Sequence, residues 1–330
     1  MSASVLLLGG TGPLGRAAAE RAVACGFGVT VGSRSEPVGL PADARWASVD
    51  ADRPDSLREV VTRRSIGVVV NFVGYAPDQV AGHIAALTGI VGQYLFISTC
   101  SVFARPVPLL PVTESSPRGQ RNFPYARLKL ECELLLEAAF RETGFPATIA
   151  RPYQTYSESR PPFLAGWTAI HRMRQGSPVI VHGDGASVWT LMHARDFARV
   201  LVPLFGNPHA IGESVNLVSS EALTWDQIHL AMAAAAGISS PQLIHRSSED
   251  IAQELPEWSA VLREDFRHSM VFDATKLTRL VPGFAPSVTF STGAREIIAY
   301  QDAHPEACTL DERLSAAFDR LATRRDLAAS

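Results

Sequence analysis

The stretch that decides the fold is Val5–Gly26, which reads VLLLGGTGPLGRAAAERAVACG. Four apolar residues come first, then three glycines spaced three residues apart, Gly9, Gly12 and Gly15, and then good helix formers as far as Gly26. A short apolar run predicts a buried strand, and alanine-rich sequence predicts a helix that a glycine ends. The segment therefore predicts a strand, a glycine turn and a helix.

Each glycine of this turn has its own physical reason. The first permits a tight turn off the strand, the second lets a pyrophosphate approach the backbone, and the third lets the helix pack against the sheet. Free N–H groups and a partial positive charge at the helix N-terminus attract phosphates. A glycine-rich turn without a ligand is the alternative, but the position between a strand and a helix favours a dinucleotide. The expected contacts are Gly9, Thr11, Gly12, Pro13, Leu14 and Gly15.

Strands and helices are expected to alternate along the first half of the chain. Further strands are predicted at 29–31, 67–74, 94–99 and 147–152, and helices at 57–64, 80–91 and 125–143. Such alternation predicts an α/β fold with a doubly wound parallel sheet of Rossmann type. We expect a dinucleotide-binding domain at 1–155 and a smaller, mixed α/β substrate domain over most of 156–330. The chain is expected to return to the first domain near 188–205.

The bulk composition narrows the class of protein. The chain has 330 residues, a formal net charge of −3 and 46% hydrophobic residues, which is typical of a globular protein. Scattered basic residues argue against nucleic acid, and no apolar run approaches the roughly 20 residues of a membrane span. The N-terminus lacks a charged segment of the signal-peptide type. Four distant cysteines predict no metal site. We therefore expect a cytoplasmic protein that acts on a small molecule.

The end of the second predicted strand bears on the choice of dinucleotide. An NAD site usually has Asp or Glu there, whereas this strand ends in Ser33 and Arg34. A guanidinium pairs well with a 2′-phosphate, so the sequence favours NADP over NAD, with an exposed turn arginine as the alternative. Asp50 follows a third strand and is a candidate for the adenine amino group, or else a turn or capping residue.

Three further residues point to hydride-transfer chemistry. Tyr125 and Lys129 are four residues apart on a predicted helix and therefore share one face. An ammonium group and a positive nicotinamide would lower the pKa of the phenol, which could then exchange a proton with an alcohol or carbonyl oxygen. Thr99 ends the strand YLFIST, and ligands bind at the carboxyl ends of parallel strands. Thr99 is therefore expected to hold the substrate oxygen beside Tyr125.

Together, the glycine turn, the strand end STCSVF and the Tyr125–Lys129 pair resemble the extended short-chain dehydrogenase/reductase family of NAD(P)-dependent epimerases, dehydratases and ketoreductases. The resemblance continues through RPY (151–153), HGDGASVWTLMHARDFA (182–198), GESVNLVSS (212–220) and 271–293. It implies that Thr99, Tyr125 and Lys129 are catalytic and that Lys129 also binds the nicotinamide ribose. It also implies that Asn71 and Gly74 pass the cofactor, and that a homodimer forms through the helices after Val80 and at Tyr125.

Departures from the family pattern bear on the substrate. Dehydratases of the family have Asp and Glu after the catalytic Thr, whereas Cys100 and Ser101 stand here, which argues against dehydration. Trp189 occupies a place where many members have a phosphate-binding Arg. Arg263 fits the spacing of a second such Arg, and Tyr153 follows the carboxyl end of a strand. The candidate substrate-binding residues are therefore Tyr153, Trp189 and Arg263.

The sequence thus predicts an NADP(H)-dependent oxidoreductase that acts on a keto or hydroxyl carbon of a sugar-type substrate. A keto-sugar reductase and an epimerase use the same groups, and the substrate is either linked to a nucleotide or free of one. Two alternatives stay open: a tailoring ketoreductase for a non-sugar metabolite, and a non-catalytic protein that senses the cofactor.

Overall fold

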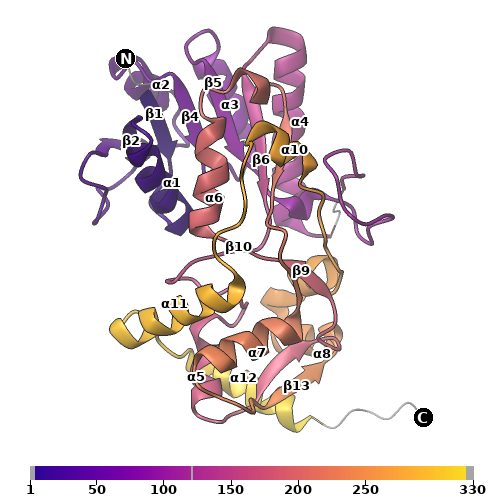
Figure 1. Ribbon diagram of the computed structural model, residues 1–330. Coiled ribbons are helices and arrows are strands. Elements are labelled where there is room, and N and C mark those ends of the chain that lie inside the picture. Colours follow the sequence, from indigo (N-terminus) through magenta and orange to yellow (C-terminus); the bar gives the residue numbers. More distant parts are fainter. Residues whose placement is uncertain (1–3, 120–121, 325–330) are drawn as a thin grey trace.

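A seven-stranded parallel sheet forms the upper lobe of the molecule (Figure 1). The computed structural model describes residues 4–119 and 122–324. The strand order is β11-β6-β5-β4-β1-β2-β3. The order reverses beside β1, so that the crevice at the carboxyl ends of β1 and β4 is the expected ligand site of such a sheet. The strands are β1 (Ser4–Leu8), β2 (Gly28–Ser33), β3 (Arg45–Ser48), β4 (Val68–Asn71), β5 (Gln93–Ile97), β6 (Ala147–Pro152) and β11 (Ser214–Leu217).

Helices cover both faces of this sheet because successive strand side chains point to opposite sides. Val5 and Leu7 of β1 belong to a core with α1 and α6, while Leu6 and Leu8 belong to a second core with α2, α3 and α4. The predicted doubly wound parallel sheet is confirmed. The helices around the sheet are α1 (Pro13–Ala24), α2 (Pro54–Arg63), α3 (Pro77–Leu87), α4 (Pro124–Thr143), α6 (Ala194–Leu201) and α10 (Thr275–Leu280).

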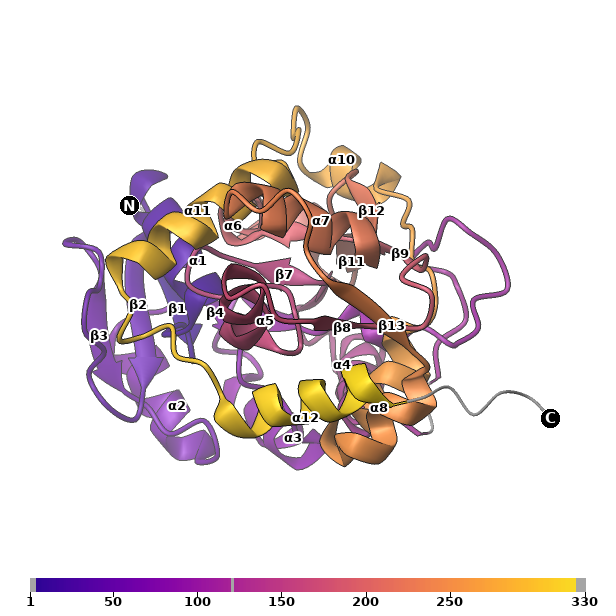
Figure 2. The same ribbon diagram turned by 90° about the horizontal axis from the view of Figure 1, so that it is seen from below.

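The lower lobe has a separate aromatic core around Trp189, Trp225 and Phe266. Seen from below, α11 and α12 flank this lobe, with α5 and β8 between them (Figure 2). Its strands form only two-stranded pairs. The elements are β7 (Thr155–Tyr156), β8 (Val179–His182), β9 (Val188–Thr190), β10 (Met192–His193), β12 (Ala222–Thr224), β13 (Leu243–Arg246), α5 (Gly166–Arg174), α7 (Trp225–Ala235), α8 (Ser248–Glu254), α9 (Ser259–Val261), a π-helical turn (Leu262–Phe266), α11 (Phe290–Ala303) and α12 (Glu312–Thr323).

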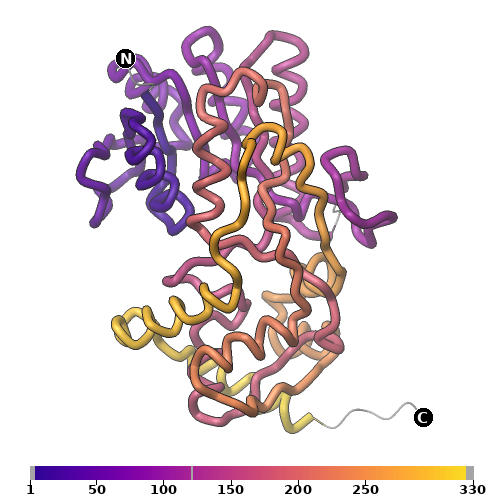
Figure 3. The backbone as a smooth tube through the Cα atoms, viewed as in Figure 1, coloured from indigo at the N-terminus to yellow at the C-terminus, as the bar shows by residue number. Residues whose placement is uncertain are grey.

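The chain passes between the lobes several times (Figure 3). After β9 and β10, α6 packs against α1 and β11 pairs with β6 at the edge of the sheet. Leu277 of α10 joins the same core later in the chain. Residues 194–217 and 275–281 therefore belong to the sheet lobe, although they lie beyond residue 155.

Two strand ends differ from the expected bounds in a way that shapes the site. β5 ends at Ile97, two residues before Thr99, and β4 ends at Asn71, three residues before Gly74. The Thr99 side chain accepts a hydrogen bond from the Ser101 N–H and caps a short 3₁₀ helix, Cys100–Val102. The residues that follow β4 and β5 therefore form turns at the carboxyl edge of the sheet instead of extending the strands.

Candidate functional site

The glycine turn after β1 is closely packed at two of its positions and open at the third. Gly9 has a φ of +73°, and its N–H donates to the Gly32 carbonyl at 2.8 Å. A Cβ on Gly15 would lie 2.4 Å from the Cα of Gly10, so only glycine lets α1 approach the turn. A Cβ on Gly12 would meet nothing within 4 Å. The backbone is therefore open to a ligand at Gly12.

The N-terminus of α1 is suited to an anion. Gly12 caps the helix without a side-chain hydrogen bond, Pro13 follows as the first helical residue, and the first turn contains no acidic residue. The N–H groups of this turn and the helix dipole are thus available to a phosphate. The Thr11 carbonyl accepts a hydrogen bond from the Arg16 side chain, and Leu14 lines the adjacent cavity. This open cradle fits the pyrophosphate of a nicotinamide dinucleotide.

The polar residues after β2 and β3 differ in how freely they can bind a ligand. Arg34 is exposed at the end of β2. The Ser33 hydroxyl donates to the Ser35 carbonyl at 2.7 Å and accepts from the Trp46 indole. The Asp50 carboxylate accepts a hydrogen bond from the Asp52 N–H, which is a turn contact. Arg34 is therefore the freest of the three predicted cofactor residues at this edge.

Asn71 and Gly74, which the resemblance assigned to the cofactor, shape the turn after β4. The Asn71 side chain is completely buried; it donates to the Tyr94 hydroxyl at 2.8 Å and accepts from the Val73 N–H at 2.9 Å. A Cβ on Gly74 would lie 2.4 Å from the Phe96 ring. The polar atoms of the Asn71 side chain are thus hydrogen-bonded within the protein, and the lack of a side chain at Gly74 lets the turn pack against Phe96.

Thr99, Tyr125 and Lys129 line one cavity of about 740 Å³ at the carboxyl edge of the sheet. Tyr125 lies in the first turn of α4, which begins at Pro124, and Lys129 lies one turn later. The Lys129 ammonium donates to the Ile97 carbonyl at 2.7 Å and lies 4.6 Å from the centre of the Tyr75 ring. Because Leu14 of the glycine turn lines the same cavity, the three predicted catalytic side chains lie beside the cofactor cradle.

Burial changes the acidity of both members of the pair. Although Tyr125 is 41% exposed, loss of hydration around its phenol raises the pKa to about 12; Tyr75 and Asp265 raise it further, whereas a hydrogen bond with Thr99 lowers it. Burial also lowers the pKa of Lys129 to about 8. The expected fall in the pKa of Tyr125, which includes the positive charge of a bound nicotinamide, stays a prediction; the protein groups alone shift this pKa upward. The phenol of Tyr125 therefore keeps its proton at neutral pH.

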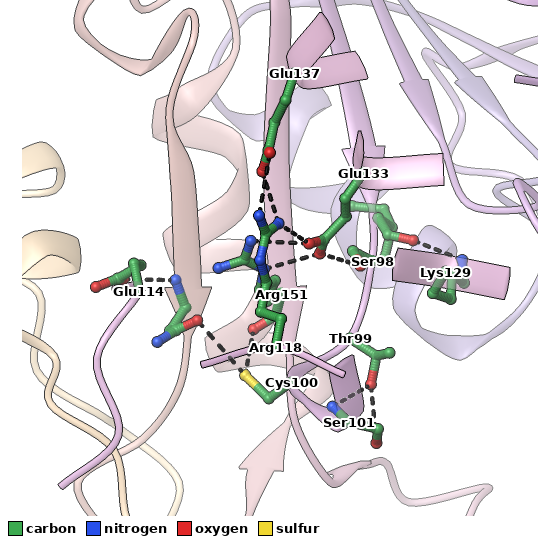
Figure 4. A network of polar contacts seen from close by, with 12 residues as sticks. Ser98, Thr99, Cys100, Ser101, Glu114, Arg118, Lys129, Glu133, Glu137 and Arg151 are labelled. Atoms are coloured by element: carbon green, nitrogen blue, oxygen red, sulfur yellow. Dashed lines mark hydrogen bonds and ion pairs between the residues drawn. The ribbon is translucent and has the colours of Figure 1, made fainter. Parts of the chain in front are cut away.

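A buried network, which the sequence analysis missed, ties α4 to the sheet (Figure 4). The Arg151 guanidinium of β6 donates to both carboxylate oxygens of Glu133, each at 2.8 Å, and the Ser98 hydroxyl donates to Glu133 at 2.6 Å. Arg118 bridges Glu133 and Glu137. Since Glu133 lies one helical turn after Lys129, this network fixes the part of α4 that carries the predicted catalytic pair. The sequence signal for this network is Glu133 itself, an acidic residue one helical turn after Lys129 on the same helix face.

Of the three candidate substrate residues, only Tyr153 lines the cavity. Its hydroxyl donates to Asp265 at 3.2 Å. Trp189 is 1% exposed, donates from its indole to the His268 carbonyl and packs on Tyr153, with ring centres 4.5 Å apart. Trp189 therefore supports the cavity wall from behind. Arg263 lies on the π-helical turn but does not line the cavity, whereas Asp265 of the same turn does.

The structure also bears on metal and membrane association. Within residues 4–119 and 122–324, no group of histidine, cysteine, aspartate and glutamate side chains could hold a metal ion. Among the described helices, none combines the length and apolar character that crossing a membrane requires.

The fold and the site define a nicotinamide-dependent enzyme of the short-chain dehydrogenase/reductase type: a cradle for a pyrophosphate lies beside a Tyr–Lys pair at the carboxyl edge of a doubly wound sheet. A family model described as the NAD-dependent epimerase/dehydratase family matches residues 5–217. The chain belongs to this family, as its sequence features indicated.

Two curated relatives match along most of the chain. The 2'-dehydrokanamycin reductase of Streptomyces kanamyceticus is 27% identical over 291 residues, which are 85% of this chain and 79% of the relative. A chloroplast stem-loop binding protein of Arabidopsis thaliana is 24% identical over 88% of this chain and 76% of its own length.

Solved structures of low sequence identity share the fold. UDP-glucose 4-epimerase from Thermotoga maritima superposes with a TM-score of 0.75 at 20% identity, covering 92% of this chain and 99% of that one. A dTDP-glucose 4,6-dehydratase from Streptomyces venezuelae gives 0.75 at 19% identity, covering 92% and 98%. At these identities the likeness establishes the fold alone.

Proposed function

We propose that this protein is an NADP(H)-dependent reductase of a keto group on a sugar-type substrate. The observation that carries the proposal is that Thr99, Tyr125 and Lys129 line one cavity with Leu14 of the glycine turn. The similarity to 2'-dehydrokanamycin reductase over 85% of the chain supports reduction of a sugar ketone. Cys100 and Ser101, in place of the paired carboxylates that dehydration needs, argue against loss of water.

The proton of Tyr125 is available for the reductive direction. With its pKa near 12, Tyr125 keeps its proton at neutral pH and can donate it to the oxygen of a carbonyl group as that oxygen gains negative charge. The Thr99 side chain orients the substrate oxygen beside the phenol. When bound, the reduced nicotinamide supplies the hydride.

Lys129 stabilises the charge that remains after proton donation. Once Tyr125 has lost its proton, a phenolate is left at the cavity wall, and the charge of a nearby ammonium stabilises it. The hydrogen bond from Lys129 to the Ile97 carbonyl holds the ammonium at the sheet edge, where Lys129 would also bind the nicotinamide ribose, as the family resemblance implies. The residues of the pair therefore act in sequence, Tyr125 as the acid and Lys129 as its electrostatic partner.

Product analysis with a panel of keto-sugars and NADPH tests the proposal. A reductase consumes one NADPH for each alcohol formed. As a control, Tyr300→Phe, which changes a tyrosine outside the cavity wall, is expected to keep this activity. An epimerase, which the related fold of UDP-glucose 4-epimerase makes the second candidate, interconverts sugars without net NADPH consumption. Binding of NADPH without turnover of any sugar would contradict both and favour a non-catalytic binding protein.

We also propose NADP rather than NAD as the cofactor, on the basis of Arg34. Its guanidinium is exposed at the end of β2, where a 2′-phosphate would lie, and Arg–phosphate pairs are strong. Arg34→Asp is expected to lower kcat/KM for NADPH by roughly tenfold or more and to leave NADH nearly unaffected. Arg21→Ala, at the far end of α1, serves as the control. An unchanged preference in Arg34→Asp would overturn the assignment.

The proposed homodimer would pack through α3 and α4. These helices lie against each other, and α4 exposes Leu134 and Leu135, whose exposed fractions are 49% and 36%. Neighbouring apolar side chains on one helix are a surface that a second copy could cover. Light scattering is expected to give twice the chain mass, and Leu134→Lys with Leu135→Lys is expected to give the monomer. A wild-type monomer at micromolar concentration would contradict the dimer.

A further inference from the structure

Asp265 is a buried carboxylate of the lower lobe that lines the cavity. It lies on the π-helical turn Leu262–Phe266, is 3% exposed and lines the cavity beside Thr99 and Tyr125. Turns of this type insert an extra residue into a helix and occur often at functional sites. Here the turn brings Asp265 and Phe266 to the cavity wall while Arg263 of the same turn stays outside it.

The carboxylate is connected to the catalytic residues by a short hydrogen-bonded chain. The Ser101 hydroxyl donates to Oδ2 of Asp265 at 2.8 Å, and the Thr99 hydroxyl donates to Ser101 at 3.2 Å. Since Thr99 also hydrogen-bonds Tyr125, two links separate Asp265 from the residue expected to hold the reacting oxygen. Asp265 therefore borders the cavity near the expected position of the reacting oxygen, without contacting that position directly.

Asp265 has acceptor capacity that the described part of the chain does not use. An ionised carboxylate accepts about four hydrogen bonds. Oδ1 accepts from the Arg105 guanidinium at 2.7 Å and from the Tyr153 hydroxyl at 3.2 Å, and Oδ2 accepts from Ser101. Arg105 is itself buried, so its charge balances that of Asp265 and keeps the carboxylate tolerable inside the protein. One acceptor position is left on a group that borders the cavity.

We propose that Asp265 is a specificity-determining residue that accepts a hydrogen bond from a substrate donor, a hydroxyl or an ammonium group, on a ring carbon next to the carbonyl being reduced. This inference rests on the proposed ketone reduction and adds a requirement for a donor beside the reacting carbon. A ketone without such a donor leaves the acceptor position unpaired, which costs binding free energy in a buried site.

Turnover of two simple ketones tests the requirement. With NADPH, wild-type kcat/KM for 2-hydroxycyclohexanone is expected to exceed that for cyclohexanone by roughly tenfold or more, because a hydrogen bond to a charged group is stronger than one between neutral groups. Asp265→Asn is expected to remove most of this ratio, because the loss for 2-hydroxycyclohexanone exceeds any loss that the two ketones share. The matched control Asp319→Asn, which removes an arginine-paired carboxylate outside the cavity wall, keeps the wild-type ratio. A wild-type ratio near one, or equal losses with both ketones in Asp265→Asn, would overturn the proposal.

Two further arms keep the test decisive. If Asp265→Asn does not fold, the double variant Asp265→Asn with Arg105→Gln removes both buried charges and takes its place in the comparison. If no ketone is turned over, the proposed reductase function fails, and calorimetry with NADP⁺ and three saturated probes judges Asp265 by itself. Either cis-1,2-cyclohexanediol or cis-2-aminocyclohexanol is expected to bind roughly tenfold more tightly than cyclohexanol, and the tighter one identifies the donor. Equal binding of all three probes would overturn the proposal.

Discussion

Tyr125 and Lys129 show what spacing alone can and cannot predict about a pair of side chains. Their separation by four residues predicted a shared helix face, and both line the same cavity. The rise in the pKa of Tyr125 was not predictable, because it comes mainly from loss of hydration in the folded protein and then from Tyr75 and Asp265, which lie far away along the chain. Asp265 itself carries no sequence signal, since a π-helical turn leaves no periodic pattern.

The lowered pKa of Lys129 predicts a pH dependence for the reduction. Lys129 loses its proton as the pH rises through about 8, and with it the charge that stabilises the Tyr125 phenolate. We expect kcat for ketone reduction with NADPH to fall above that pH. In Lys129→Met this fall should disappear from an already slow reaction. Lys276→Met, at a partly exposed lysine paired with Glu213, should keep the wild-type profile. A wild-type rate that increases through pH 8 would contradict this role.

The attachment of α4 to the sheet depends on contacts that only the tertiary structure brings together. The sequence predicted the helix at 125–143 and the strand at 147–152, close to the observed Pro124–Thr143 and Ala147–Pro152. It did not predict that Glu133 and Arg151 would meet, because their pairing requires β6 to lie beside β5 under the helix. Trp189 shows the same limit: its position in the sequence pointed to substrate, whereas its surroundings make it a packing residue.

Removing Glu133 should strongly destabilise the protein. Glu133→Ala leaves the Arg151 guanidinium buried without its carboxylate, and breaking such a pair costs about 3–5 kcal/mol. Urea denaturation measures the loss in the free energy of unfolding. The control is Glu131→Ala, which removes an exposed ion pair with Arg127 and should cost about 1 kcal/mol or less. Similar losses in the two variants would show that the buried network does not hold α4.

The two lobes differ in how much of them the sequence could predict. The central strands β1, β4 and β5 are short, mostly apolar runs with helices between them along the chain, so the fold class followed directly. The lower lobe contains strand pairs of two to four residues joined across long intervals, such as β8 with β13, and such short elements carry little periodicity. A return of the chain near 188–205 was expected; the edge strand at Ser214–Leu217 and the contribution of α10 were not.

Buried histidines in the lower lobe predict acid sensitivity of the whole molecule. Burial lowers the pKa of His182 and of His229 from 6.5 to about 4. Both are neutral in the folded protein, while the unfolded chain takes up protons below pH 6.5, so stability falls as the pH falls from 6.5 toward 4. At pH 5 each histidine accounts for a loss of about 2 kcal/mol relative to pH 7. Urea unfolding at the two pH values measures this loss.

A histidine substitution separates this effect from general acid denaturation. His229→Phe keeps a ring against Phe163 and should lose roughly half of the pH dependence that the two histidines produce. His209→Gln, at an exposed position, should keep the wild-type dependence. Equal pH dependence in His229→Phe and wild type would mean that other groups cause the acid sensitivity.

The most direct test of the proton-donor role is a single-turnover measurement with Tyr125→Phe. NADPH-loaded enzyme is mixed with a saturating keto-sugar that the wild type reduces, and the oxidation of NADPH is followed by absorbance. The loss of a positioned general acid should slow this step by roughly 10²–10⁴-fold, while the Kd for NADPH stays near the wild-type value because the cradle at the α1 N-terminus is unchanged. A Tyr125→Phe rate close to that of the wild type would contradict the assignment of Tyr125 as the proton donor.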